Sequence, residues 1–208
     1  MKNDLNDDYN GFAATEPPLL REQKRRLRQA LLATKDRALP ADPLLGRAVC
    51  EKIAALPCFL RASALLLYYP VRGEIDPLPL AAIAEQNGVP VGFPVCDPKS
   101  KTLTFRSATA NTQFEAGLYG IPVPPEDAPE PTIDERTVCL VPALGYDKNR
   151  YRIGHGGGYY DRFLADFPGK AIGMTFEDLI LETVFPEPHD RAVDLLVTEK
   201  RVYTKEKD

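Results

Sequence analysis

The sequence predicts a single α/β domain in which helices cover both faces of a mainly parallel β-sheet, giving three layers. Helix-like and strand-like segments alternate along the chain, which is the pattern of parallel strands joined by crossover helices. Residues 64–69 (ALLLYY) form a continuous apolar run, as expected of a strand buried on both faces. A length of 208 residues suits one core, so we expect one domain over residues 19–204, without internal repeats.

The first folded element is expected to be a long helix. Residues 1–18 are polar and acidic and end in two prolines, which predicts a disordered N-terminal tail. Leu20, Leu27 and Leu31 then recur on one helical stripe. Their spacing predicts a helix over residues 19–38.

Two more helices and several strands are expected in the middle of the chain. A helix over 42–56 precedes the strand at 64–69, and a helix over 76–86 has Pro77 in its first turn and Gly88 just beyond its end. The next expected elements are a strand at 89–95, an alternating edge strand at 102–107, a proline-rich surface loop at 117–131 and a buried strand at 137–144.

The last part of the chain continues the alternation. The expected elements are a helix at 159–167, a strand at 170–176, a short helix at 178–184 and a last strand at 195–198. In open sheets of this kind, ligands bind beyond the carboxyl ends of the parallel strands. Polar residues that follow the strands at 64–69 and 137–144 are therefore candidates for a binding site.

The composition argues against several classes of protein. The chain has 44% apolar and 27% charged residues, as a soluble globular protein does. A net charge of −4 argues against a general nucleic-acid binder, which would carry a broad basic face. There is no apolar run of membrane-spanning length and no apolar signal core, so we expect a cytoplasmic protein without a membrane partner. Four cysteines without a CxxC pair and two histidines favour neither disulfides nor a histidine-based metal site.

A glycine-rich segment carries most of the chemical information. It contains Arg152, Gly154, Gly156, Gly157, Gly158, Tyr159, Tyr160 and Asp161, and it joins an expected strand to an expected helix. This arrangement can aim backbone N–H groups at a phosphate. The segment lacks the Gly-Lys-Ser/Thr of a P-loop, and Tyr159 stands where the dinucleotide-binding pattern needs its third glycine. Phosphate binding and an ordinary tight glycine turn both remain open.

Several charged residues admit two interpretations each. Asp161 either caps the expected helix or holds Mg²⁺ near a phosphate. Lys24, at the margin of the apolar stripe, either extends to solvent or points inward at an anion. Glu74 is either a surface-turn residue or an acceptor for paired N–H groups of a heterocycle. Asp190 and Asp194 either cap a turn and a strand or add carboxylates to a metal site.

Four segments together resemble one protein family. They are residues 24–28 (KRRLR), 73–76 (GEID), 141–161 and 193–199 (VDLLVTE). In this order they are similar to the motifs of 5-formyltetrahydrofolate cyclo-ligase, also called methenyltetrahydrofolate synthetase, and the resemblance spans residues 24–199. His155 departs from the pattern, because many members have arginine at this position.

The resemblance implies an ATP-dependent ligase of folate and one-carbon metabolism. Such an enzyme uses MgATP to convert 5-formyltetrahydrofolate to 5,10-methenyltetrahydrofolate, with ADP and phosphate as products. The formyl oxygen is phosphorylated, and N10 then closes the ring. The alternatives are a folate- or nucleotide-binding relative without catalytic activity and a different small-molecule kinase on the same scaffold.

The resemblance also implies roles for individual positions. ATP would be bound by Lys24, Arg25, Arg26, Leu27, Arg28, Arg152, Ile153, Gly154, His155, Gly156, Gly157, Gly158, Tyr159 and Tyr160, with Lys24 and Arg152 as catalytic residues. The folate would contact Tyr69, Glu74, His155, Gly156, Gly157, Gly158 and Tyr159. Asp161 and Asp190 would hold Mg²⁺, with Asp194 as the alternative to Asp190. We expect a monomer.

Overall fold

The computed structural model describes residues 18–38, 43–71 and 73–205. Apart from Pro18, the predicted tail lies outside the described residues. The helices are α1 (Pro18–Ala38), α2 (Pro43–Ala54), α3 (Pro57–Leu60), α4 (Leu78–Gln86) and α5 (Tyr159–Ala165), with 3₁₀ turns η1 (Leu118–Gly120) and η2 (Glu177–Leu179). Within the described ranges, no helix combines the length and the apolar character needed to cross a membrane.

Seven strands form the central sheet in the order β11-β10-β9-β6-β1-β2-β3. They are β1 (Leu65–Leu66), β2 (Val91–Asp97), β3 (Thr102–Ser107), β6 (Val138–Val141), β9 (Lys170–Met174), β10 (Leu195–Val197) and β11 (Val202–Thr204). The inner strands from β10 to β2 run parallel, while β3 and β11 are antiparallel to their neighbours at the two edges. This confirms the predicted α/β fold with a mainly parallel sheet.

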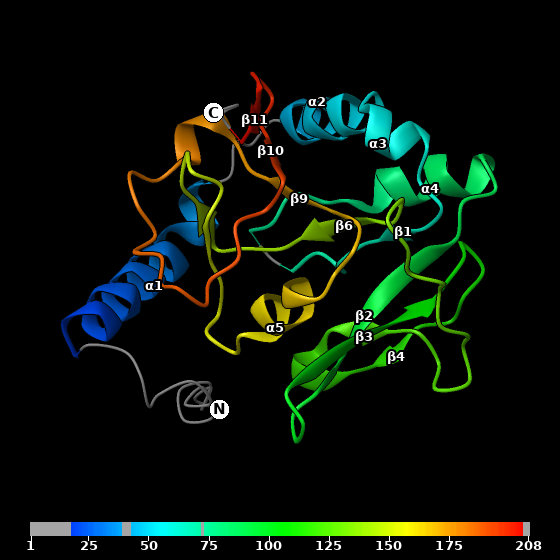
Figure 1. Ribbon diagram of the computed structural model, residues 1–208, viewed down its shortest axis with the longest axis horizontal. Coiled ribbons are helices and arrows are strands. Elements are labelled where there is room, and N and C mark those ends of the chain that lie inside the picture. The colour runs from blue at the N-terminus through cyan, green and yellow to red at the C-terminus, as the bar shows by residue number, and fades with distance from the viewer. Residues whose placement is uncertain (1–17, 39–42, 72, 206–208) are drawn as a thin grey trace.

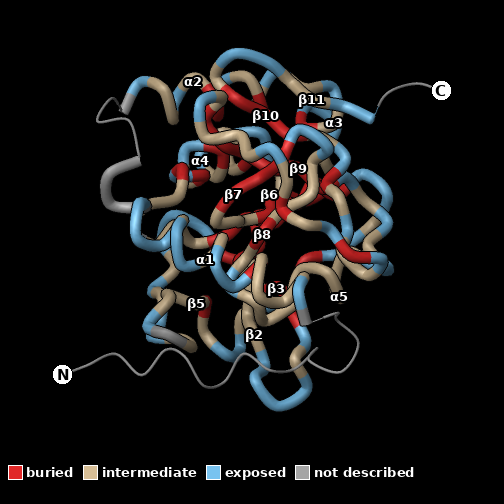
Figure 2. Tube along the Cα trace, turned by 90° about the vertical axis from the view of Figure 1, so that its left-hand side faces the viewer, coloured by how far each residue is buried: buried red, intermediate tan, exposed pale blue. Residues whose placement is uncertain are grey.

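Side chains alternate between the two faces of the sheet, so each face has its own apolar core. On one face, Leu65 and Leu67 pack in a cluster with Ile53 of α2 and Leu80 of α4. On the other face, Leu66 belongs to a cluster that includes side chains of α5. The helices α2, α3 and α4 lie above the sheet in Figure 1 and α5 lies below it, which gives the predicted three layers. The buried residues follow the central strands in Figure 2.

The predicted short helix at 178–184 is wrong beyond its first turn. Only η2 forms, closed by hydrogen bonds such as the one from Leu179 N to Phe176 O. The backbone N–H of Leu181 then donates to Tyr146 O at 2.8 Å. Pairing with a distant segment therefore replaces the helical hydrogen bonds that the local sequence favours.

Other differences concern short elements. The strand at 195–198 is not the last, because β11 follows it after a turn closed by the bond from Thr198 N to Arg201 O. The predicted loop at 117–131 contains η1 and the strand β5 (Pro122–Val123), which pairs with β4 (Glu115–Ala116). The predicted strand at 137–144 ends at Val141, and the chain continues into a separate hairpin of β7 (Gly145–Tyr146) and β8 (Arg152–Ile153).

Candidate functional site

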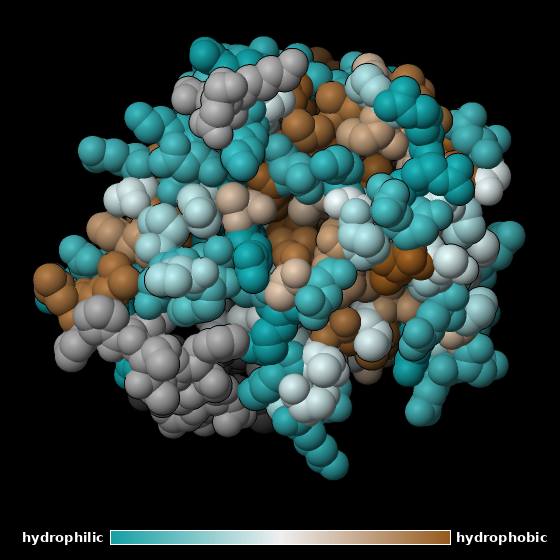
Figure 3. All heavy atoms as spheres, in the orientation of Figure 1, coloured by the Kyte–Doolittle hydropathy of each residue, from teal (hydrophilic) through white to brown (hydrophobic). Residues whose placement is uncertain are grey.

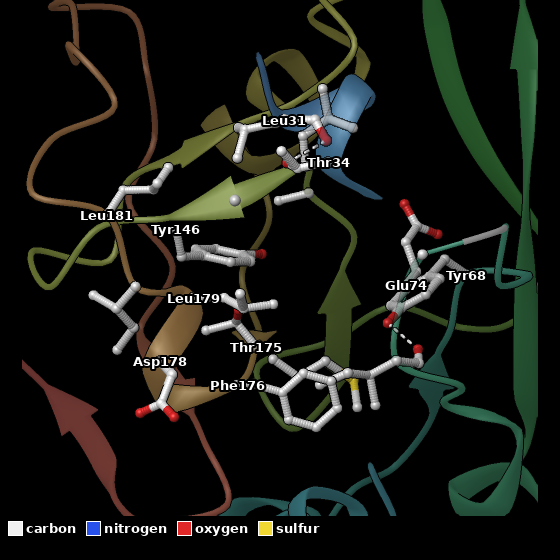
Figure 4. Close-up of a pocket in the computed structure, with 17 residues that line it drawn as sticks. Leu31, Thr34, Tyr68, Glu74, Tyr146, Thr175, Phe176, Asp178, Leu179 and Leu181 are labelled. Atoms are coloured by element: carbon white, nitrogen blue, oxygen red, sulfur yellow. Dashed lines mark hydrogen bonds between the residues drawn. The ribbon is translucent and has the colours of Figure 1, made fainter. Parts of the chain in front are cut away.

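A cavity of about 210 Å³ lies beyond the carboxyl ends of β1, β6 and β9. Its wall consists of Leu31 and Thr34 of α1 together with residues from segments 68–75, 143–146 and 174–181. Figure 4 shows Glu74 and Tyr68 on one side of the space and Tyr146, Leu179 and Leu181 on the other. In Figure 3, hydrophilic side chains cover most of the visible surface, and apolar ones show between them near its centre. The cavity is at the edge of the sheet where the sequence predicts ligand binding.

Tyr146 forms one wall of the cavity and is almost completely buried. Its hydroxyl donates to Val141 O at 2.6 Å. A Cβ atom at Gly173 would lie 2.6 Å from the Tyr146 ring, so only glycine at this position of β9 leaves space for the ring. Burial raises the pKa of Tyr146 well above its ordinary value, so the hydroxyl stays protonated.

Glu74 lines the cavity from the turn after β1, as its position in the sequence predicts. The turn is closed by its backbone N–H, which donates to Val71 O, and by its carboxylate, which accepts from Val71 N, both at 3.1 Å. Gly73 makes this turn possible with a φ of +85°. Of the two tyrosines that precede the turn, Tyr68 lines the cavity. The ring of Tyr69 packs against Phe93 and Phe114, with ring centroids 6.3 and 5.5 Å away.

The glycine-rich loop lies between β8 and α5, and two arginines hold its backbone. Arg28 Nε donates to Gly154 O at 3.0 Å, so α1 reaches the loop. Arg162 Nη2 donates to Gly157 O at 2.7 Å. Gly158 adopts a left-handed conformation with φ of +65° and precedes α5 without a side-chain cap. The glycines of the loop and the hydrogen bonds from two arginines to its carbonyl oxygens thus define its conformation.

Arg152 and Asp161 form an ion pair beside this loop, with 2.6 Å between Arg152 Nη2 and Asp161 Oδ1. The same carboxylate oxygen accepts from the backbone N–H of Arg191 at 3.2 Å, and Arg152 Nη1 donates to Arg191 O at 2.5 Å. Asp161 therefore does not cap α5, whose N-cap is Gly158. Its carboxylate instead joins the start of the helix to the segment that contains Asp190.

Lys24 points inward from α1 and is buried between two carboxylates. Its Nζ atom lies 2.5 Å from Glu187 Oε2 and 2.8 Å from Asp190 Oδ2. His189 stands beside them, with Nε2 3.7 Å from Asp190 Oδ1. Burial alone would lower the pKa of Lys24, but the hydrogen bonds that it donates to Asp190 and Glu187 outweigh burial and raise this pKa. Glu187 was not predicted from the sequence, although it lies three residues before Asp190.

Some predicted residues lie elsewhere. Arg25 and Arg26 form ion pairs with Glu22 at 2.8 and 2.6 Å and have side chains that are 61% and 75% exposed. Asp194 accepts from Ala171 N at 2.8 Å, at the amino end of β9. Asp194 therefore lies at the end of this strand opposite to the cavity.

The residues predicted for Mg²⁺ have suitable chemistry. Asp161 and Asp190 are hard oxygen donors. Asp161 lies next to the glycine-rich loop and accepts from Arg191 N, and Asp190, the neighbour of Arg191, contacts Lys24. Mg²⁺ is commonly bound by one or two carboxylates together with substrate phosphates. Among the described residues, no group of three or more histidine, cysteine or acidic side chains is arranged for a metal. The two carboxylates thus have the donor chemistry that Mg²⁺ prefers, and each of them contacts a basic side chain, Arg152 or Lys24.

Tyr160, in the first turn of α5, has a buried hydroxyl. No hydrogen-bond partner for this hydroxyl is present among the described residues. Burial raises its pKa well above the usual value, and the nearby Cys139 and Cys96 add to the effect. A buried hydroxyl normally has a partner. Tyr160 packs against the apolar cluster on the α5 face of the sheet, which includes Leu66 and Cys139.

Comparison with known proteins places these features in one context. The model of the family described as the 5-formyltetrahydrofolate cyclo-ligase family matches residues 20–199. A 5-formyltetrahydrofolate cyclo-ligase of Mycolicibacterium smegmatis is 30% identical over 188 residues, which cover 86% of this chain and 94% of the relative. An enzyme of the same name from Escherichia coli K12 is 23% identical over 164 residues, covering 76% of this chain and 90% of the relative.

Two solved structures have a similar fold. The solution structure of the Aquifex aeolicus 5,10-methenyltetrahydrofolate synthetase has a TM-score of 0.75 and 26% identity, covering 89% of this chain and 94% of that chain. A 5,10-methenyltetrahydrofolate synthetase from Mycoplasma pneumoniae has a TM-score of 0.63 and 20% identity, covering 85% of this chain and 98% of the other. The second likeness supports the fold alone.

Proposed function

Because this chain belongs to the 5-formyltetrahydrofolate cyclo-ligase family, we propose that it uses ATP to convert 5-formyltetrahydrofolate to 5,10-methenyltetrahydrofolate, releasing ADP and phosphate. The observation that supports the proposal is that α1 links two features: its Leu31 and Thr34 line a cavity that contains Glu74, and its Arg28 contacts the glycine-rich loop. This arrangement suits a reaction between a phosphate donor and a heterocyclic acceptor. We propose that the enzyme acts as a cytoplasmic monomer.

The proposed chemistry needs no nucleophile from the protein. The formyl oxygen attacks the γ-phosphorus of ATP, the bond to ADP breaks, and an iminium phosphate forms. N10 of the folate then attacks the activated carbon and releases its proton, and the C–O bond breaks as phosphate departs. An oxygen that is a poor leaving group becomes a good one, so the task of the protein is to position the reactants and to neutralise charge.

The basic residues suit the phosphate half of the reaction. Arg28 contacts the loop directly, and Arg152 lies at its start with a side chain that is 5% exposed. Lys24 approaches from α1 and carries a fixed positive charge. Asp161 and Asp190 would hold Mg²⁺, which when bound neutralises charge on the phosphate oxygens. Carboxylates hold Lys24 and Arg152 in place, and a carbonyl oxygen of the loop holds Arg28.

The cavity suits the folate half. Glu74 supplies a carboxylate that can accept two N–H groups of a pterin, while Tyr146 and Phe176 supply flat aromatic surfaces. Its volume of about 210 Å³ matches a ring system better than a whole folate, whose remainder would extend to solvent. Tyr69, with Phe93 and Phe114, forms a separate aromatic group that the substrate would reach from the open side.

The decisive experiment is a spectrophotometric assay of purified protein with 5-formyltetrahydrofolate and MgATP. The expected result is growth of the methenyltetrahydrofolate absorbance, dependent on both substrates, with one ADP formed for each product molecule. ADP formation with another acceptor and no methenyltetrahydrofolate would indicate a different small-molecule kinase. Binding of folate or ATP without turnover would indicate a relative that has lost catalysis, and either outcome would contradict the proposal.

A further inference from the structure

Asp147 is a buried carboxylate to which the proposed reaction assigns no role. It follows β7 directly, and 1% of the residue is exposed. Its Oδ1 atom accepts from the backbone N–H groups of Asn149 at 2.9 Å and Tyr151 at 3.1 Å. These bonds close the turn between β7 and β8, in which Arg150 adopts a positive φ of 69°. The turn determines how the chain enters β8, and therefore where Arg152 begins the glycine-rich loop.

The other oxygen of the same carboxylate contacts a different part of the chain. Asp147 Oδ2 accepts from the backbone N–H of Val184 at 3.3 Å, which is 37 residues away in sequence. Val184 is buried and lies three residues before Glu187, the partner of Lys24. Asp147 thus contacts both segments that supply charges to the candidate site.

We propose that Asp147 is a positioning residue that holds the hairpin carrying Arg152 and the segment carrying Glu187 and Asp190 in a fixed relation. A carboxylate suits this role because it has acceptors only and can take all three N–H donors. An amide in its place would present an NH₂ group to at least one donor. The proposal concerns geometry alone, since Asp147 lines neither the cavity nor the glycine-rich loop.

Two backbone hydrogen bonds flank the Asp147 side chain and also join the hairpin to neighbouring segments. Leu181 N donates to Tyr146 O at 2.8 Å on one side, and Val193 N donates to Arg150 O at 3.1 Å on the other. Between them, the turn and the segment before Glu187 meet at the Asp147 side chain. If these flanking bonds were sufficient, the carboxylate would be dispensable for catalysis, and this is the alternative that the experiment must exclude.

Two substitutions separate closure of the turn from the link to Val184. Asp147→Asn keeps the shape of the side chain, but its NH₂ group would face a backbone N–H, so that two donors oppose each other. Asp147→Ser retains an oxygen that can close the turn, as serine does in ST-turns, but it cannot also reach Val184. Asp134→Asn is the matched control, because Asp134 also accepts from a backbone N–H in a turn, that of Arg136 at 2.8 Å, but lies at the amino end of β6, away from the site.

The kinetic part rests on the proposed function, so turnover of the wild-type enzyme is measured first. In both Asp147 variants kcat should fall about tenfold to a hundredfold, the effect of small displacements of catalytic groups, with a smaller change in KM. Asp134→Asn should lower the melting temperature without changing kcat. A folded Asp147→Ser variant with normal kcat and KM would overturn the proposal, because the flanking backbone bonds would then suffice.

Hydrogen exchange on the wild-type protein tests the link between Asp147 and Val184 without relying on activity or on the folding of a variant. The amides of Tyr151 and Val184 should both be protected, since they donate to the two oxygens of one carboxylate, and Asp147→Ser should release Val184 while Tyr151 stays protected. Unprotected exchange of Val184 in the wild type would also overturn the proposal. Protected amides in a protein without turnover would show that the proposed function fails while the positioning contact stands.

Discussion

The charge of Asp161 is the residue-scale feature that most directly tests the phosphate site. Asp161→Asn retains an oxygen for the N–H of Arg191 but loses the ion pair with Arg152, in which 2.6 Å separates the two groups. A charge-assisted hydrogen bond contributes about 1.5–3 kcal/mol, so a moderate decrease in stability is expected. If Asp161 holds Mg²⁺, kcat should fall steeply and added Mg²⁺ should restore part of it. Measurement of kcat against Mg²⁺ concentration decides this, and a folded variant with near-normal kcat at ordinary Mg²⁺ would rule out the metal role.

Lys24 should affect both stability and ATP use, because it is buried between two carboxylates. Lys24→Met keeps most of the apolar stem but leaves Glu187 and Asp190 without their cation. Loss of one partner from a buried ion pair costs about 3–5 kcal/mol, and the KM for ATP should rise as well. Denaturant unfolding and ATP kinetics are the measurements.

The stability control for Lys24 lies two residues away on the same helix. Arg26→Ala removes an ion pair with Glu22 whose arginine is 75% exposed, and such surface pairs contribute about 0–1 kcal/mol. Unfolding free energies that fell equally in both variants would mean that the buried arrangement of Lys24 is not maintained in solution. An unchanged KM for ATP in Lys24→Met would remove Lys24 from the phosphate site.

At the scale of elements, the glycine-rich loop depends on a left-handed residue before α5. Gly158→Ala places a side chain at φ of +65°, which costs about 1–2 kcal/mol and should displace the loop amides. Gly88→Ala, after α4, is the control, because Gly88 has a φ of +70° and open space around it, yet lies away from the site. Both variants should lose similar stability, but only Gly158→Ala should raise the KM for ATP. Equal kinetics in the two variants would separate the loop from ATP binding.

The parallel strands and the long helices were predictable from the sequence, whereas two short elements were not. Continuous apolar runs and helical spacing predicted the parallel strands and the long helices, because burial on both faces leaves a local signal. The strand β11 was missed because Val202–Thr204 is short and has no fully buried residue. The helix at 178–184 failed because Leu181 pairs with Tyr146, a contact between distant segments.

In the candidate site, too, residues with a local sequence signal were predicted, and residues placed by distant contacts were not. Glu74 and the glycine-rich loop were found because they follow strands directly in the sequence. Glu187 was missed because it is 163 residues from Lys24, its partner. Tyr146 was missed because its place in the cavity depends on the absence of a side chain at Gly173, on another strand. Contacts of this kind follow from the folded arrangement and leave no pattern in the local sequence.

At the scale of the whole molecule, the N-terminal residues should be dispensable. Residues 1–17 lie outside the described residues, and they precede both the motifs that resemble the family and the matched range 20–199. Their deletion should leave the melting temperature and turnover nearly unchanged, as measured side by side with the full chain. A large loss of either quantity would show that this segment contributes to the folded domain.

The strand order has a consequence for where chemistry can evolve in this fold. After β1 the chain builds outward to β2 and β3, whereas after β6 it builds in the opposite direction to β9, β10 and β11. The boundary between β1 and β6 is thus a topological switch point, where consecutive connections leave on opposite sides and open a crevice at the carboxyl edge. The strands β1 and β6 lie side by side in Figure 1, and the segments that follow them bound the cavity. The crevice is therefore a product of chain topology, and substitutions in its loops can change the substrate while the sheet that creates the opening stays the same.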